Sequence, residues 1–105
     1  MPTRKIRLNL QEEIIVREIL QTHLPGREVW VFGSRIGDNP KQYSDLDLLV
    51  RDDAPLPAAT LYALKEAFEE SNLPFQVDIV EWATTSERFR QIIAANYLPI
   101  QHAKV

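Results

Sequence analysis

The segment VWVFGSRIGDNPKQYSDLDLLV, residues 29–50, contains two apolar runs separated by a polar loop. The first run ends at Gly33 and Ser34, and ten residues separate Ser34 from Asp45. The second run, DLDLLV, opens with two aspartates, although the rest of it has the composition of a buried strand. Because residues two apart in a strand face the same side, we expect Asp45 and Asp47 to project together and the leucines between them to point to the core.

The paired aspartates predict a site for a divalent cation. Two carboxylates held this close repel each other, and a cation removes that conflict. Oxygen ligands without His or Cys favour Mg²⁺ or Mn²⁺. Asp78, in QVDIVEW, can join Asp45 and Asp47 if its strand lies beside theirs. Three such carboxylates would hold two metal ions about 4 Å apart, the arrangement that clamps the attacking and leaving oxygens in phosphoryl transfer.

The residues that end the first apolar run predict an anion-binding turn. Glycine at position 33 lets the backbone approach a phosphate closely, and Ser34 adds a hydroxyl donor. Exposed backbone N–H groups at such a turn bind anions. Arg35 follows directly and either pairs with a phosphate or has a structural role. The segment is not a P-loop, because the Gly-Lys-Ser/Thr signature is missing.

The composition is that of one small globular domain. The chain has 105 residues, 45% apolar and 26% charged, and we expect residues 1–105 to form a single domain. A formal net charge of −3 argues against direct nucleic-acid binding, which needs a basic surface. The absence of cysteine excludes disulfides and thiolate chemistry. No apolar run approaches membrane-spanning length and no signal-peptide core is visible, so we predict a cytoplasmic protein without a membrane partner.

Three helices are predicted outside the central segment. Asn9 and Glu12 form a capping box at the start of the first helix, which ends at Pro25. The second helix covers residues 58–71. Another capping box, over residues 84–87, starts the last helix. The apolar residues assigned to this last helix are Phe89, Ile92, Ile93 and Leu98.

Strands are predicted at residues 28–32, 45–50 and 75–82, with a loop and one helical turn over 33–44. Helices and strands then follow in the order α-β-β-α-β-α. The connection between the first two strands is too short for a full helical crossover, which parallel neighbours usually need, so we expect the sheet to be mixed. The pattern predicts an α/β (α+β) fold with a small mixed sheet of about three strands packed by helices.

The stretch FGSRIGDNPKQYSDLDLLV resembles the signature of polymerase-beta-like nucleotidyltransferases: Gly-Ser, ten residues, then Asp-x-Asp. More narrowly, the chain is similar to the minimal nucleotidyltransferases, short members often paired with a helical HEPN protein. The likeness covers nearly the whole chain. It implies the nucleotidyltransferase fold, with Gly33 and Ser34 binding the triphosphate, Asp45 and Asp47 binding both metal ions, and Asp78 completing the site.

The resemblance also implies an activity and a partner. A nucleoside monophosphate, with AMP from ATP as the default, would move to an acceptor hydroxyl on a HEPN-type helical protein. In some such pairs the helical protein is a toxin ribonuclease and the transferase is its antitoxin. The assembly would be a homodimer or a heterotetramer. The alternatives are transfer to a small-molecule acceptor bound by a helical partner subunit, and a non-catalytic subunit that binds nucleotide.

Glu81 and a set of aromatic residues are expected to have supporting roles. Glu81 is expected on the same face as Asp78, with a supporting or solvent role. Part of an aromatic set is expected to form a partner surface together with the last helix, and most of the set is expected to be core. That set is Trp30, Phe75, Trp82, Phe89 and Tyr97.

Overall fold

The computed structural model describes residues 5–37 and 44–104 of the chain. Its elements in chain order are α1 (Leu10–His23), β1 (Glu28–Phe32), the 3₁₀ turn η1 (Gly33–Ile36), β2 (Leu46–Arg51), α2 (Ala58–Glu69), β3 (Val77–Glu81), the 3₁₀ turn η2 (Trp82–Thr84), α3 (Glu87–Ala94) and β4 (Tyr97–Gln101). The strands form one mixed sheet in the order β3-β2-β1-β4. β1 runs antiparallel to β2 and β4, whereas β2 and β3 are parallel and α2 makes the crossover between them. The predicted mixed α/β architecture is confirmed.

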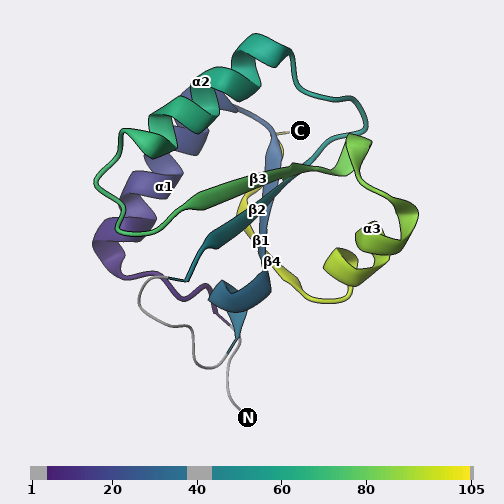
Figure 1. Ribbon diagram of the computed structural model, residues 1–105, viewed down its shortest axis with the longest axis horizontal. Helices are drawn as coiled ribbons and strands as arrows, with labels where there is room; N and C mark the ends of the chain where they lie inside the picture. The colour runs from purple at the N-terminus through teal and green to yellow at the C-terminus, as the bar shows by residue number, and fades with distance from the viewer. Residues whose placement is uncertain (1–4, 38–43, 105) are drawn as a thin grey trace.

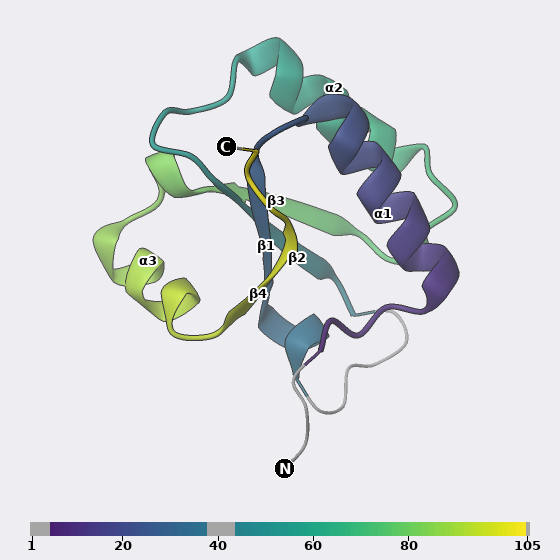
Figure 2. The same ribbon diagram turned by 180° about the vertical axis from the view of Figure 1, so that it is seen from behind.

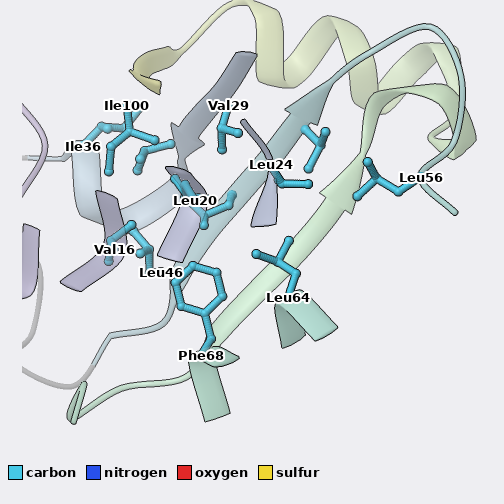
Figure 3. Close-up of a cluster of buried hydrophobic side chains, with 13 residues drawn as sticks. Val16, Leu20, Leu24, Val29, Ile36, Leu46, Leu56, Leu64, Phe68 and Ile100 are labelled. Atoms are coloured by element: carbon cyan, nitrogen blue, oxygen red, sulfur yellow. The ribbon is translucent and has the colours of Figure 1, made fainter. Parts of the chain in front are cut away.

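The sheet separates two layers of helices. α1 and α2 cover one face and α3 lies on the other, with β3 and β4 as the two edges of the sheet (Figures 1 and 2). The larger core lies between the sheet and the α1/α2 layer (Figure 3), and Leu20, Leu46 and Leu64 are fully buried there. A smaller cluster of Trp30, Leu49 and Ile93 lies on the α3 side.

Local sequence signals account for the helix starts. Asn9 accepts a hydrogen bond from the backbone N–H of Glu12 at 2.8 Å, and the Glu12 carboxylate accepts one from the N–H of Asn9 at 3.0 Å. This confirms the first predicted capping box. Ser86 caps α3, and its hydroxyl accepts a hydrogen bond from the N–H of Phe89 at 3.2 Å. The second predicted capping box, over residues 84–87, is wrong, because Thr84 belongs to η2 and the helix begins only after Ser86. Within residues 5–37 and 44–104, no helix has the length and apolarity needed to cross a membrane.

The last helix is shorter than predicted, and a fourth strand follows it. α3 ends at Ala94, and Leu98 lies in β4, paired with Val31 of β1. Pro99 supplies the physical reason, because proline disfavours the helical conformation of the residue before it and is tolerated in an edge strand. The prediction of about three strands is therefore corrected to four, and the order becomes α-β-β-α-β-α-β.

Candidate active site

Asp47 and Asp78 are direct neighbours across the parallel strands β2 and β3. Leu46 and Leu48 belong to the core beneath α1 and α2, so Asp47, which alternates with them, projects to the opposite face. Asp78 projects to that same face, since Val77 and Ile79 on either side of it pack against the α1/α2 core. The predicted position of the third strand beside the second is confirmed, and it brings the two carboxylates together.

The acidic residues share one electrostatic environment. Burial of the half-buried Asp47 carboxylate raises its pKa, and the negative charges of Asp78 and Asp45 raise it further. Asp45 is exposed and lies directly before β2, because the strand begins one residue later than predicted. The charged form of Asp47 is therefore disfavoured, and a cation bound nearby would offset that cost.

The three aspartates offer only oxygen atoms as ligands, and the half-buried Asp47 lies near two other negative charges. Such a set of ligands fits a hard divalent cation. In the described part of the chain, however, no three His, Cys, Asp or Glu side chains stand in an arrangement that could hold a metal ion. The structure thus pairs Asp47 with Asp78 and places Asp45 nearby, without closing the three around one point. The two-metal site stays a prediction.

Gly33 joins the predicted anion-binding turn to the acidic residues. Phe32, the last residue of β1, pairs with Asp47 of β2, so the chain turns into η1 beside the carboxylate. The φ angle of Gly33 is +77°, in the left-handed region that favours glycine. A Cβ atom at this position would lie 2.4 Å from Oδ2 of Asp47. Glycine is therefore required both by the backbone conformation of the turn and by the short distance to the Asp47 carboxylate. The exposed Ser34 follows it at the open side of the turn.

Arg35 is buried, with 4% of its surface exposed. Its Nε and Nη2 atoms donate to the carbonyl of Ser44 at 3.1 and 2.8 Å, and Nη1 donates to the carbonyl of Arg7 at 3.0 Å. The guanidinium also lies 4.2 Å from the ring centroid of Phe75. These contacts favour the structural role over phosphate binding: Arg35 ties the two ends of the loop to each other and to the N-terminal segment. Lys41, a cation within that loop, lies outside the described residues.

Most of the aromatic set is packed on the α3 side of the sheet. Trp30 stacks on Tyr97 with ring centroids 3.8 Å apart, and Trp82 meets Trp30 edge-on at 5.7 Å. Phe32, which the sequence analysis did not single out, contacts Phe89 edge-on at 5.9 Å. Its alternation with Trp30 along β1 was the signal that could have placed it on the face of Asp47.

The expectation for Glu81 was wrong. It lies three positions from Asp78 and so faces the opposite side of the sheet. There its carboxylate accepts a hydrogen bond from the backbone N–H of Leu56 at 3.0 Å, which holds the segment that leads into α2.

The sequence matches known proteins over most of its length. A family model described as "Nucleotidyltransferase domain" matches residues 13–100. A protein of Haemophilus influenzae named "Probable protein adenylyltransferase MntA" is 50% identical over 91 residues, which are 87% of this chain and 80% of that protein.

Solved structures with low sequence identity share the fold. A chain of a toxin–antitoxin structure with AMP-PNP has a TM-score of 0.69 and 22% identity, over 92% of this chain and 76% of that chain. A chain from a complex of tri-AMPylated Shewanella oneidensis HEPN toxin with MNT antitoxin has a TM-score of 0.59 and 18% identity, over 87% and 70% of the two chains. The paired aspartates, the glycine turn and the extent of the family match lead to one conclusion: this chain belongs to the family of nucleotidyltransferase domains.

Proposed function

We propose that the chain is a metal-dependent protein adenylyltransferase, which acts in the cytoplasm as the antitoxin of a HEPN-type partner. In this proposal AMP moves from ATP to a hydroxyl group of that partner. The observation that carries the proposal is the in-register pair of Asp47 and Asp78, with Gly33 directly against Asp47. The relative that is 50% identical over 91 residues is named a probable protein adenylyltransferase, and this name supports a protein as the acceptor. The similar structures with AMP-PNP and with an AMPylated HEPN toxin support the donor and the partner.

The donor would bind with its phosphates over the Gly33 turn. The left-handed backbone of Gly33 and the exposed hydroxyl of Ser34 leave donors at the open side of η1, which suits the negative charge of a triphosphate. Asp47 and Asp78, with Asp45, would hold two ions of Mg²⁺ or Mn²⁺. Such ions, when bound, supply charge neutralisation at the triphosphate and lower the pKa of a coordinated hydroxyl.

Asp78 is the residue best placed to handle the acceptor proton. It is exposed, whereas its neighbour Asp47 is half-buried against Gly33. In the proposed reaction Asp78 orients the acceptor hydroxyl and accepts its proton. The hydroxyl oxygen then forms a bond to the α-phosphorus of ATP, and the bond from that phosphorus to the bridging oxygen breaks. Pyrophosphate leaves, and catalysis comes from positioning and charge stabilisation.

The test is transfer of labelled AMP to the HEPN-type partner in the presence of Mg²⁺, with the modified residue located by mass spectrometry. Asp78→Asn is nearly isosteric, so it should keep the fold and lose transfer. Asp53→Asn is the matched control, because the side chain of Asp53 is 93% exposed in the turn after β2. Transfer by Asp78→Asn at the wild-type rate would refute the role of Asp78. Label found on a small molecule, or bound nucleotide without any transfer, would favour the two alternative functions.

A further inference from the structure

We propose that the acceptor segment of the partner protein binds in an extended conformation along the outer edge of β3, as an added strand of the sheet. The inference rests on the proposed function, because it assigns the route by which the acceptor hydroxyl reaches Asp78. β3 is an edge strand that has β2 on its inner side. The helices lie to either side of β3 rather than over its outer edge, which faces the viewer in Figure 1.

The backbone of β3 presents unpaired hydrogen-bonding groups at this edge. The N–H of Leu46 donates to the carbonyl of Gln76 at 2.9 Å, so the backbone groups of Gln76 point toward β2. Successive residues of a strand direct their N–H and C=O groups to alternate sides. The groups of Asp78 therefore also point to β2, and those of Val77 and Ile79 point outward. Within the described residues, no strand and no side chain pairs with these outward groups.

The opposite edge of the same sheet is protected against such pairing. Pro99 in β4 has no N–H group to offer. The guanidinium of Arg17 donates to the carbonyl of Ile100 and so occupies that acceptor. Proline and side-chain cover are devices that blunt an exposed edge. Within the described residues, β3 carries neither of them over residues 77–80, and only the carbonyl of Glu81 at its end accepts a hydrogen bond, from the hydroxyl of Thr84 at 3.5 Å. The edge at Val77 and Ile79 is therefore the one left open for a partner strand.

A groove runs along the open edge on its α2 side. It has a volume of about 420 Å³, and it is lined by α2, by the segment before β3, and by β3 itself. Phe68, Leu73 and Ile79 give it apolar walls, and the exposed Lys65 and Glu69 also line it. Asp78 is also among the lining residues, so the groove runs along the strand segment whose opposite face carries the Asp78 side chain.

An added strand would present alternate residues to the two faces of the sheet. A residue directly opposite Asp78 would place its side chain on the face of Asp78 and Asp47, with Cβ atoms of adjacent strands about 5 Å apart. The residues before and after it would point into the groove beside Phe68 and Leu73. The geometry therefore selects an acceptor segment in which a hydroxyl-bearing residue has apolar neighbours in the sequence.

Amide hydrogen exchange, measured by NMR on the intact chain with and without the HEPN-type partner, tests this mode of binding. The amides of Val77 and Ile79 should exchange freely in the chain alone and slow by more than about tenfold in the complex. The amide of Asp78, already bonded to β2, is the internal reference and should change little. Unchanged exchange at Val77 and Ile79, in a complex that accepts AMP, would overturn the inference.

A tryptophan placed in the groove gives a second readout. Glu69→Trp would fill the groove from the exposed side of α2, and Glu66→Trp makes the same change at an exposed α2 position that does not line it. Glu69→Trp should raise the KM for the partner by at least about tenfold, with ATP binding unchanged, and Glu66→Trp should behave as wild type. Equal KM values for the two variants would overturn the edge model and leave the proposed function standing. Failure of the wild-type chain to modify the partner at all would instead refute the proposed function.

Discussion

Replacement of Gly33 by alanine distinguishes the backbone strain of the turn from the position of the Asp47 carboxylate. An L-residue at a φ of +77° costs about 1–2 kcal/mol. The new methyl group would also lie 2.4 Å from Oδ2 of Asp47, so one of the two groups must move. The obstructing atom is the end of a side chain, so the carboxylate can rotate away. The steric part of the cost should therefore appear in activity more than in stability.

Gly26 provides the matched control. Its φ angle is +78°, but a Cβ atom there would meet only Cβ of Lys104, at 3.9 Å. Gly26→Ala should thus lose the same 1–2 kcal/mol as Gly33→Ala, which corresponds to a fall in Tm of roughly 5–15 °C for a domain of this size. Only Gly33→Ala displaces Asp47, and misplacement of a reacting group by about 1 Å costs on the order of 100-fold in rate.

Urea unfolding of both variants and their rates of AMP transfer under identical conditions give the comparison. We expect equal losses of stability and about a 100-fold difference in transfer. Full transfer activity in Gly33→Ala would refute the view that the turn holds Asp47 in place. An equal loss of activity in Gly26→Ala would show that backbone strain, and not the contact with Asp47, limits the rate.

Three further outcomes are expected. Asp47→Asn should raise the free energy of unfolding at pH 7 without metal, because burial and the charges of Asp78 and Asp45 raise the pKa of Asp47 above its ordinary value in the folded state, and wild-type stability therefore falls as the pH rises from the unfolded pKa through the folded pKa. Urea titrations should show this gain shrinking as the pH falls toward the ordinary pKa of aspartate. Calorimetry should show ATP binding that requires Mg²⁺ or Mn²⁺ and is lost in the double variant Asp45→Asn/Asp47→Asn; equal, metal-independent binding in both proteins would contradict the two-metal site. Arg35→Lys keeps the charge but loses the paired contact with the Ser44 carbonyl, so it should lower stability by about 2 kcal/mol, whereas a residue that served only the phosphate would lower ATP affinity and leave stability unchanged.

The parts of the fold that depend on local chemistry could be predicted from the sequence. Strand formers bounded by glycine placed β1 at residues 28–32, the bounds that the structure shows. The capping box of Asn9 and Glu12 fixed the start of α1. Alternation along β2 separated Asp47 from the leucines beside it, because the period of a strand does not depend on distant contacts.

What could not be predicted depends on contacts between distant segments. The closeness of Gly33 to Asp47 follows from the register of β1 against β2, which the sequence does not state. The role of Arg35 depends on the path of the N-terminal segment, which brings the carbonyl of Arg7 within reach of a residue 28 positions away. β4 is a different case, since Pro99 is a local signal in the sequence that already disfavours a helix through Leu98.

The arrangement of the aromatic residues means that two spectroscopic signals report on different sides of the sheet. Both tryptophans of the sequence, Trp30 and Trp82, lie in the cluster on the α3 side, and Tyr97 is stacked on Trp30. Tryptophan emission therefore monitors the α3 layer, whereas most of the helical circular dichroism arises from α1 and α2, the two longer helices. Because coincident curves from different probes are the test of a two-state transition, an emission change at lower urea than the dichroism change would mean that α3 and its cluster detach while the other layer is still folded.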